Sequence, residues 1–430
     1  SGERQDAHAF LGAAADTGAF VIVRKGHPAL EGHPTLRGVA VDDTLVALGE
    51  LAREHRAQWP GRVVGITGSM GKTTTKRLMA AGLAGVGTRV WATPGNLNNR
   101  VGVPMTLFML DERYDHAVIE MGTSEPGEIA RLAAISRPDV AVVTHVAVAH
   151  TAGLGTLEDV AVEKGALFAS LAPFQVAVGC GDDDHVTRQL ALSPAQRKVR
   201  YGLGPDNLWR ARVLEVDASG TRIALDRAAD ERDPGAQLEL RVRLIGDSAA
   251  ENVAAVAAVL EALGFVAHHA FQVLAAVEPE PGRLVPRPLK GERLLLDDTY
   301  NANPASTAMA IKTASRIATE AGRPFVAVLG DMRELGRNSV AEHRAVGGLL
   351  ASLKARLLIT AGPEMRAAAR AARERGVLVY ETGSSEAAAL AALALVHDRD
   401  VVLVKGSRSL RMERVVDTLS GQRATDEARG

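Results

Sequence analysis

Short apolar runs alternate with segments of helical spacing through the middle of this chain. Residues 63–67, 117–120 and 140–144 are apolar runs typical of buried strands, and residues 72–85 have the spacing of a helix that buries one face. Strands that alternate with helices predict a parallel sheet covered by helices on both sides. Functional side chains of such sheets gather at the carboxyl ends of the strands, so we expect a site at this edge.

The hydrophobic pattern changes in residues 199–245, where apolar and polar positions alternate. This period of two predicts antiparallel strands at 210–214, 221–225 and 238–244. A segment of helical spacing follows at 249–263. We therefore expect a small antiparallel sheet in addition to the parallel one.

The last part of the chain returns to strands that alternate with helices. Its expected strands are residues 294–297, 325–329, 356–360, 377–380 and 401–404, with alanine-rich helices between them. The first part also shows short apolar runs beside a helical segment, as a smaller module. The pattern therefore predicts an α/β protein of three units, at 1–60, 61–281 and 282–430.

Composition limits the classes of function that this chain of 430 residues can have. Only 3% of its residues are aromatic, which argues against stacking platforms for nucleic-acid bases. A net charge of −1 gives no sign of a polyanionic or membrane-surface partner. No apolar run reaches the roughly 18 residues that a membrane span needs. The single cysteine, Cys180, excludes an internal disulfide and fits a reducing cytosol, so we expect a cytoplasmic protein.

The most informative motif follows the first strand of the middle unit. Residues 65–76 read Gly-Ile-Thr-Gly-Ser-Met-Gly-Lys-Thr-Thr-Thr-Lys. Glycines between a strand and a helix let main-chain N–H groups face phosphates, and the helix N-terminus adds its positive dipole end. Lys72 can then reach the terminal phosphates, and the Thr73 hydroxyl can hold Mg²⁺. Ile66 replaces the first glycine of the strict pattern, and a glycine-rich turn that binds nothing is the alternative.

Three residues beyond this motif are candidates for metal binding or catalysis. Glu120 ends a predicted strand, where a carboxylate can ligate Mg²⁺ beside Thr73 because this ion prefers oxygen donors. His150 follows the third strand and is a metal ligand, a phosphate contact or an ordinary polar residue. Lys164 lies in a helical segment, where a solvated lysine is the ordinary interpretation.

One loop of the middle unit is rich in amides. Asn96, Asn98 and Asn99 lie between two glycines, and their side chains can bind oxygen-rich groups. A plain turn is the alternative, because Asn and Gly also favour turns.

Two loops of the last unit follow predicted strands. Residues 297–304 combine two acids, a tyrosine and two asparagines, which suit ribose hydroxyls and the edge of adenine. Residues 405–409 form a cationic loop in which Arg408 can bind a carboxylate. A solvated loop is the alternative for each.

Together these segments resemble the Mur ligases. The similarity runs over nearly the whole chain, and its most specific parts are residues 67–74, 95–107, 297–306, 328–336 with His343, and 405–413. It implies a domain for the UDP end of the substrate at 1–60, a central ATP-binding domain at 61–281 and a Rossmann-like ligase domain at 282–430. The first residues match a point well inside the family's first domain, so we expect that domain to be truncated here.

The resemblance also implies an activity. It implies ATP-dependent amide formation through an acyl phosphate, and the members that the chain resembles most join D-alanyl-D-alanine to a UDP-N-acetylmuramoyl-tripeptide in cell-wall precursor synthesis. ATP and Mg²⁺ are the implied cofactors, the implied partners are these small molecules, with no nucleic acid and no membrane, and we expect a monomer. Lys164 falls on a lysine that relatives carbamoylate so that it helps to hold Mg²⁺.

Site residues are carried over from the family by position. The catalytic residues are Lys72, Lys164 and His150, and the metal ligands are Thr73, Glu120, Lys164 and His150. The residues expected to bind ATP are Thr67, Gly68, Ser69, Met70, Gly71, Lys72, Thr73, Thr74, Asn252, Arg283, Asp298, Tyr300, Asn301 and Asn303. The residues expected to bind the other substrates are Asn96, Asn98, Asn99, Lys405, Ser407 and Arg408.

The chain departs from the family pattern at three positions of the site. His145 stands for the usual asparagine, Ala152 for the usual acid and Ser248 for the usual histidine. A Mur-like ligase redirected to another acid and amine is therefore an alternative, as is a nucleotide-binding scaffold without catalysis. A P-loop GTPase is disfavoured because the chain has no Asn-Lys-x-Asp reader of guanine. The sequence leaves the third residue of the tripeptide open between lysine and meso-diaminopimelate.

Overall fold

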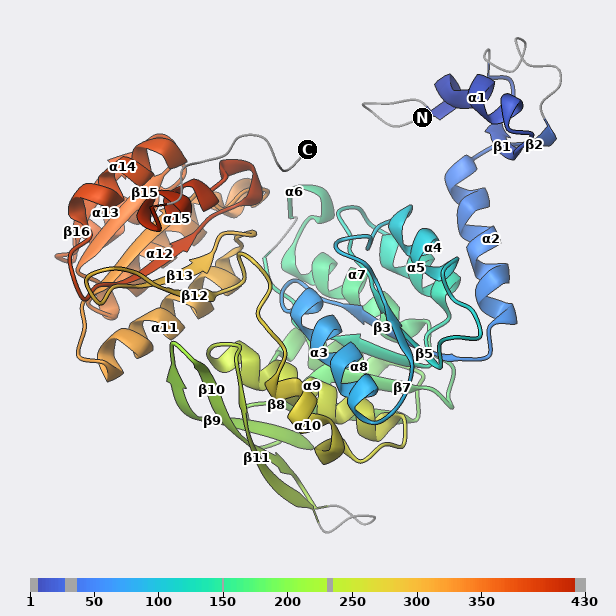
Figure 1. Ribbon diagram of the computed structural model, residues 1–430, viewed down its shortest axis with the longest axis horizontal. Helices are drawn as coiled ribbons and strands as arrows, with labels where there is room; N and C mark the ends of the chain where they lie inside the picture. The colour runs from blue at the N-terminus through green and yellow to red at the C-terminus, as the bar shows by residue number, and fades with distance from the viewer. Residues whose placement is uncertain (1–6, 28–36, 149–150, 230–234, 422–430) are drawn as a thin grey trace.

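The computed structural model describes residues 7–27, 37–148, 151–229 and 235–421. These residues form three sheets, of two, nine and six strands, which Figure 1 shows as three regions along the chain. The two larger sheets are mostly parallel and carry helices on both faces, which confirms the predicted α/β fold.

The two-stranded sheet lies at the N-terminal end of the described residues, apart from the larger sheets (Figure 1). The Asp43 carboxylate accepts hydrogen bonds from two main-chain N–H groups at 2.7 and 3.1 Å, and these bonds start helix α2. This helix packs against α4 and α5 and so ties the small sheet to the middle region. The elements are η1 (Ala7–Phe10), α1 (Leu11–Asp16), β1 (Phe20–Arg24), β2 (Arg37–Val41) and α2 (Thr44–Gln58).

The nine-stranded sheet of the middle region has the order β11-β10-β9-β8-β7-β6-β3-β5-β4. β3 lies between β5 and β6 and pairs parallel with both, so the carboxyl ends of these three strands are neighbours. The predicted strands of the parallel part are confirmed. They are β3 (Arg62–Thr67), β5 (His116–Glu120) and β6 (Val140–Val143), and the parallel part also contains β4 (Val90–Ala92), β7 (Val176–Cys180) and β8 (Arg197–Gly202), which were not predicted.

The predicted antiparallel strands continue this same sheet. They are β9 (Trp209–Asp217), β10 (Gly220–Arg227) and β11 (Ala236–Val242). β9 joins the parallel part through a short pairing with β8, in which Tyr201 lies opposite Trp209. In Figure 1 these strands extend below the rest of the middle region.

Alternation along the strands of the middle region divides the core into two layers. Val64 and Ile66 of β3 face α3 and α9, whereas Val63 faces the layer that contains α5 and α7. Apolar side chains therefore cover both faces of the sheet, as a buried parallel sheet requires. The helices are α3 (Lys72–Gly85), α4 (Gly102–Leu107), α5 (Glu128–Ser136), α6 (Thr151–Leu154), α7 (Leu157–Ala169), α8 (Asp184–Leu192), α9 (Asp247–Ala262), η3 (Ala267–Ala270) and α10 (Phe271–Ala275).

The C-terminal region is a six-stranded sheet of order β12-β13-β17-β14-β15-β16, in which only β12 runs antiparallel to its neighbour. The strands are β12 (Val285–Pro288), β13 (Leu294–Asp298), β14 (Phe325–Gly330), β15 (Leu357–Ala361), β16 (Leu378–Thr382) and β17 (Val401–Lys405). The helices are α11 (Pro304–Glu320), η4 (Gly336–Asn338), α12 (Ser339–Ser352), α13 (Arg366–Arg373), α14 (Ser385–Leu395), η5 (Arg408–Leu410) and α15 (Glu413–Leu419).

The two large regions share apolar contacts beside the cleft that separates their sheets. Val216 of β9 and Ile245 of the middle region belong to the same buried cluster as Ile311 of α11. Thr151 also donates a hydrogen bond to the carbonyl oxygen of Leu335 at 3.2 Å. The described regions therefore meet on both sides of one cleft. Every helix in the described part of the chain is too short or too polar to cross a lipid bilayer.

Candidate active site

One cavity lies where the carboxyl ends of strands from both large sheets face each other. Its volume is about 460 Å³, which is in the usual range for a small-molecule site. The residues proposed from the sequence that line it are Ser69, Met70, Gly71, Lys72, Thr73, Thr74, Asn96, Asn98, Asn99, Glu120, Lys164, Asn252, Arg283, Asp298, Tyr300, Asn301, Asn303 and Lys405.

The turn before α3 requires glycine at two positions. Gly68 has a φ of 149°, and a Cβ atom there would lie 2.0 Å from the Thr144 hydroxyl oxygen. Gly71 has a φ of 80° and directly precedes α3, whose first N–H groups receive no side-chain cap. Free N–H groups and the positive end of the helix dipole thus border the cavity, an arrangement suited to an anion.

Lys72 begins α3, and its side chain folds back over the turn. Its Nζ donates a hydrogen bond to the Gly68 carbonyl oxygen at 2.7 Å. Burial lowers the pKa of Lys72, while the negative charge of Glu120 opposes this shift and Arg283 adds to it. Lys72 can therefore supply positive charge to an anion that lies against the turn.

Thr73 and Glu120 meet at the floor of the cavity. The Thr73 hydroxyl donates to Glu120 Oε1 at 3.2 Å, and Asn98 Nδ2 donates to the same oxygen at 2.9 Å. The other oxygen, Oε2, forms an ion pair of 3.1 Å with Lys76 Nζ. Burial raises the pKa of Glu120, but the positive charges of Lys76 and Lys72 outweigh burial and leave this pKa lowered. The carboxylate is therefore held in its ionised form.

These oxygen atoms fit a magnesium ion. Two neighbouring ligands of an octahedral Mg²⁺ lie about 3 Å apart, and Thr73 Oγ1 and Glu120 Oε1 are 3.2 Å apart. The described residues contain no cluster of three His, Cys, Asp or Glu side chains that could hold a metal. An ion at Thr73 and Glu120 would therefore need further oxygen ligands, and phosphates of a nucleotide on the α3 turn can supply them.

Lys164 enters the cavity from α7. The helix begins at a capping box in which Thr156 and Asp159 bind each other's main-chain N–H groups. Lys164 is buried, and no hydrogen bond or ion pair is found between it and any described residue. The carboxylate of the neighbouring Glu163 is engaged elsewhere, since it accepts hydrogen bonds from the main chain of Gly127 and Ile129. Burial lowers the pKa of Lys164 to about 7, and the charge of Lys72 adds to this shift.

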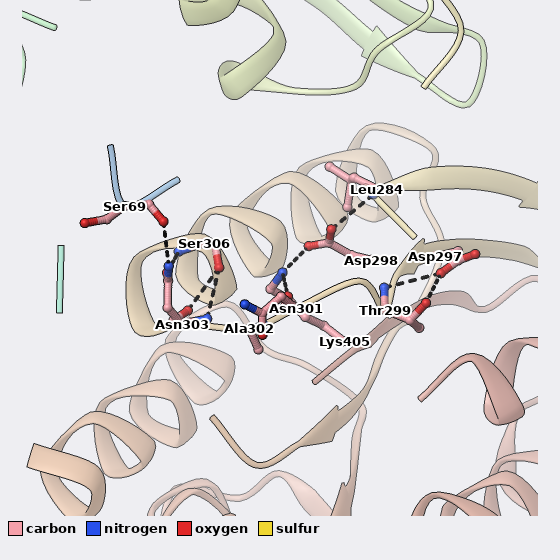
Figure 2. Close-up of polar contacts among 10 residues, drawn as sticks. All are labelled: Ser69, Leu284, Asp297, Asp298, Thr299, Asn301, Ala302, Asn303, Ser306 and Lys405. Atoms are coloured by element: carbon pink, nitrogen blue, oxygen red, sulfur yellow. Dashed lines mark hydrogen bonds and ion pairs between the residues drawn. The ribbon is translucent and has the colours of Figure 1, made fainter. Parts of the chain in front are cut away.

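The opposite wall comes from the C-terminal region, and Figure 2 shows its polar contacts. Lys405, the last residue of β17, forms an ion pair of 2.6 Å with Asp298, the last residue of β13. Lys405 also donates to the Asn301 carbonyl oxygen at 2.8 Å. Asn303 caps α11 by accepting from the Ser306 main chain at 2.9 Å. These bonds fix the loop between β13 and α11.

Two contacts between described residues cross the cavity from this wall to the α3 turn. Asn303 Nδ2 donates to the Ser69 carbonyl oxygen at 3.2 Å (Figure 2). Arg283 Nη2 donates to the Thr73 hydroxyl at 3.0 Å, and its guanidinium lies 4.1 Å from the centre of the Tyr300 ring. The second wall therefore places one more positive charge beside the turn.

The remaining side of the cavity comes from α9 and the loop after β6. Asn252 Oδ1 accepts a hydrogen bond from the Thr75 hydroxyl at 2.9 Å. His145 Nε2 lies 3.6 Å from the Glu251 carboxylate, and Ser248 lines the cavity nearby. Burial raises the pKa of Glu251 to about 8, and the charges of aspartates on neighbouring elements add to this shift. Burial also lowers the pKa of His145, so a neutral pair borders the cavity at pH 7.

Several residues proposed from the sequence do not line the cavity. Thr67 ends β3, and its hydroxyl donates to the Met121 carbonyl oxygen at 2.9 Å, while Gly68 belongs to the turn but is absent from the cavity wall. Ser407 is buried and accepts a hydrogen bond from the Arg333 main chain at 2.8 Å. The Arg408 side chain is 57% exposed and lies 3.6 Å from Glu413. His150 lies outside the described residues.

Several polar residues of the site were missed by the sequence reasoning, among them Lys76 and Glu251, and also Thr123, Ser124, Glu128 and Ser306, which line the cavity. Lys76 pairs with Glu120, and its position four residues after Lys72 in a helical pattern was a signal, because both side chains then share one helix face. Glu251 had no comparable signal, since its burial depends on how α9 packs.

Comparisons with known proteins agree with this geometry. Residues 66–260 match the family model described as the Mur ligase middle domain, and residues 282–408 match the model described as Mur ligase, glutamate ligase domain. The chain is 35% identical over 422 residues to the UDP-N-acetylmuramoyl-tripeptide--D-alanyl-D-alanine ligase of Escherichia coli (strain K12). That alignment covers 97% of this chain and 89% of that protein.

Solved structures give the same result. A crystal structure of MurF from Acinetobacter baumannii is similar with a TM-score of 0.85 and 28% identity, and the match covers 98% of this chain and 89% of that one. The MurF ligase from Thermotoga maritima in complex with ADP is similar with a TM-score of 0.82 and 28% identity, over 98% of this chain and 93% of that one. The family resemblance predicted from the sequence is confirmed.

Proposed function

The chain belongs to the Mur ligase family, and we propose that it joins D-alanyl-D-alanine to a UDP-N-acetylmuramoyl-tripeptide at the expense of ATP. The relative from E. coli carries this activity in its name. The observation that carries the proposal for this chain is one cavity in which Lys72, Glu120 and Lys164 face Arg283 and Asp298 across the cleft. A nucleotide and a carboxylate can meet there with positive charge around them.

The proposed reaction has two steps. An oxygen of the substrate carboxylate attacks the γ-phosphorus of ATP, and the bond between this phosphorus and the bridging oxygen breaks. ADP is released, and the carboxylate becomes an acyl phosphate. The amine nitrogen of the dipeptide then attacks the acyl carbon, loses one proton, and expels phosphate as the bond between this carbon and the phosphate oxygen breaks. Both steps depend on alignment and neutralised charge more than on a protein nucleophile.

We propose that Lys72 and the α3 turn bind the phosphates, with the other ATP residues predicted from the sequence around them. Lys72 is half-buried near Glu120 and is directed over the turn, which supports this role. Thr73 and Glu120 would hold Mg²⁺, as the 3.2 Å spacing of their oxygens supports. The ion supplies charge neutralisation for the transferred phosphoryl group when it is bound. His150 is retained as a proposed metal contact.

We propose that Lys164 carries a carbamate. A carbamate forms when a neutral amine attacks CO₂ and loses a proton, and the amine of Lys164 is largely neutral above pH 7 because burial lowers its pKa to about 7. The product is an anion, which would be compensated by the nearby Lys72. This modified side chain would present a carboxylate to the cavity, where it could help to hold Mg²⁺.

The domain assignments stay part of the proposal, with substrate binding at 1–60, ATP binding at 61–281 and amine binding at 282–430. Asn96, Asn98 and Asn99 line the cavity and are proposed to contact the acid substrate. Lys405, Ser407 and Arg408 are proposed to serve the dipeptide. Both walls of the cavity come from one chain, which supports a monomer, and the need for ATP and a UDP-linked precursor supports a cytoplasmic location.

The experiment is a direct assay of the purified chain. ATP, Mg²⁺, D-alanyl-D-alanine and UDP-muramoyl-tripeptide are mixed, with either lysine or meso-diaminopimelate as third residue, and ADP release is measured together with the mass of the product. We expect one ADP per amide formed, with at least one of the two tripeptides. Lys72→Ala and the omission of dipeptide are the controls.

Other outcomes identify the alternatives. Turnover with another acid and amine, but with neither tripeptide, would establish a redirected ligase. ADP binding without turnover of any acid, together with unchanged cellular function of Lys72→Ala, would establish a nucleotide-binding scaffold. Each of these results would overturn the proposed activity.

A further inference from the structure

Lys76 is a buried cation that the proposed reaction does not use. It lies one helical turn after Lys72 on α3, and its side chain is 4% exposed. Its Nζ lies 3.1 Å from Glu120 Oε2 and donates a hydrogen bond to the Gly95 carbonyl oxygen at 2.9 Å. Burying a charge is costly unless it is paired, so both partners of Lys76 matter for its position.

The two oxygens of Glu120 have different neighbours. Oε2 is directed to Lys76, whereas Oε1 is the oxygen that meets the Thr73 hydroxyl at 3.2 Å and Asn98 Nδ2 at 2.9 Å. A carboxylate turns about its last bond unless both oxygens are held. Lys76 therefore sets which oxygen of Glu120 faces Thr73, and this is the pair of oxygens that fits a magnesium ion.

The same lysine touches the loop of asparagines. It binds this loop at Gly95, and Asn98 returns to the Glu120 strand, because its carbonyl oxygen accepts from the Gly122 main chain at 2.7 Å. A Cβ atom at Gly122 would lie 2.9 Å from Asn98 Oδ1, so the loop is packed tightly against this strand. The loop, Glu120 and Lys76 thus form one connected unit.

We propose that Lys76 is a positioning residue, which holds the Glu120 carboxylate for the metal ion and couples it to the loop that contains Asn96, Asn98 and Asn99. The inference rests on the proposed function in one respect only, that the cavity takes Mg²⁺ with a nucleotide. Lys76 need not touch a substrate, because its Nζ contacts are Glu120 and Gly95. Groups that hold a metal ligand in place commonly contribute tenfold to hundredfold to metal affinity.

The test measures binding of ADP by calorimetry as Mg²⁺ is varied. Lys76→Met keeps the length of the side chain and removes its charge, and we expect its half-saturating Mg²⁺ concentration to rise at least tenfold. Affinity for ADP without Mg²⁺ should change by less than about twofold, because the lysine does not contact the α3 turn. Lys198→Met is the matched control, since Lys198 is exposed on β8 and donates to the Ala191 carbonyl oxygen.

A second variant covers the case in which Lys76→Met does not fold. Lys76→Arg keeps the charge, but its larger planar group does not reproduce both contacts, and we expect a rise of about threefold to tenfold in half-saturating Mg²⁺. Coupling to the loop is measured separately, as the factor by which Mg²⁺ with ADP strengthens the binding of UDP-muramoyl-tripeptide. We expect this factor to be smaller in either variant than in the wild type.

The outcomes separate this inference from the proposed function. If Mg²⁺ fails to strengthen ADP binding to the wild-type chain, the proposed metal site is wrong and Lys76 loses its role with it. If the wild type responds to Mg²⁺ and the folded Lys76 variants respond equally, or more strongly, the positioning role is wrong while the metal site stands. A wild type that binds Mg²⁺ with ADP but makes no amide overturns only the ligase activity.

Discussion

The two walls of the cleft hold their polar side chains in different ways. On the middle wall, Glu120 is fixed by Lys76 and Asn98, both from the same region, and all are packed under the α3 turn. On the C-terminal wall, Arg283 and Asn303 are fixed partly by contacts that cross the cleft. The first wall can therefore keep its geometry by itself, whereas the second depends on how the two regions sit together.

This difference suits a reaction in which the nucleotide binds before the chemistry is assembled. A prearranged wall lowers the cost of binding phosphate and metal, because its groups do not have to be ordered at that moment. A wall supplied by a second domain can close afterwards and exclude water, as lids do in other enzymes. The contrast predicts that substitutions on the middle wall affect the chemical step most, and those on the other wall affect substrate binding more.

The largest expected effect concerns the middle wall. Lys164→Ala should lower kcat for ADP release by about 10²- to 10³-fold, because the proposed carbamate would be lost with the amine. Bicarbonate should not restore activity, and ¹³C-bicarbonate should give a carbamate signal in the wild type that is missing from the variant. Lys198→Ala is the control. Activity within twofold of the wild type would remove Lys164 from the mechanism.

The second largest effect is expected when the contact of Arg283 across the cleft is removed. Arg283→Ala should raise the KM for ATP and reduce kcat/KM by about tenfold to hundredfold, because one charge-assisted hydrogen bond and one positive charge beside the phosphates are removed. Steady-state kinetics with ATP as the varied substrate measures this effect. Arg293→Ala, at a half-buried arginine of the same region that does not line the cavity, should change it less than twofold. A loss in kcat alone would mean that the two walls do not differ as described.

A smaller effect on kinetics is expected for a substitution in the loop after β17, and it tests whether this part of the C-terminal wall affects substrate binding. Arg408→Ala should raise the KM for D-alanyl-D-alanine about tenfold and leave the KM for ATP within twofold, because the proposed carboxylate contact of this exposed side chain would serve only the dipeptide. Kinetics with each substrate varied in turn separates the two values. Equal effects on both would take Arg408 out of the dipeptide site.

The last prediction concerns stability and not kinetics, and it is a dependence of the free energy of unfolding on pH at the side of the cavity near α9. Burial raises the pKa of Glu251 to about 8 from an ordinary 4.5, so the folded chain binds more protons there than the unfolded chain between these values. Its contribution to the free energy of unfolding is complete below pH 4.5 and is lost as pH rises to 8, by up to about 1.4 kcal/mol per pH unit.

Glu251→Gln removes this titration and nearly keeps the shape of the side chain. Urea unfolding of both proteins at pH 5, 6, 7 and 8 should therefore show a shallower decline in the variant. Parallel curves for the two proteins would mean that Glu251 keeps an ordinary pKa in the folded state. Burial lowers the pKa of Lys164 to about 7, so its contribution to the free energy of unfolding rises as pH rises above 7, opposite to that of Glu251. The variant and the wild type are therefore compared at each pH.

The sequence predicted the middle wall better than the other wall. The strand before Gly68, the helix after Gly71 and the carboxylate at the end of β5 follow from local patterns, because parallel strands place their carboxyl ends at one edge. The order of the strands, with β3 between β5 and β6, does not follow from local patterns. It depends on which helix packs on which face.

The residues that lie outside the cavity, or that were missed, depend on contacts distant in the sequence. The spacing from Lys72 places Lys76 on the same helix face, but nothing near Lys76 indicates that its partner is Glu120, 44 positions later. Ser407 and Arg408 follow a strand correctly predicted to end near the cavity, yet the chain turns away directly after Lys405. The path of the chain after this strand depends on how η5 and α15 pack, and a single sequence does not reveal that packing.

The side-chain amide of Asn303 makes two different contacts, one through its oxygen and one through its nitrogen. Its oxygen accepts the N–H of Ser306 and so begins the longest helix of its domain, while its nitrogen donates to Ser69 in the facing domain. The same side chain therefore contributes both to the start of α11 and to the contact between the two regions. An aspartate would keep the cap of α11 and lose the hydrogen bond to Ser69. The C-terminal region would then fold normally but would be held less firmly against the middle region.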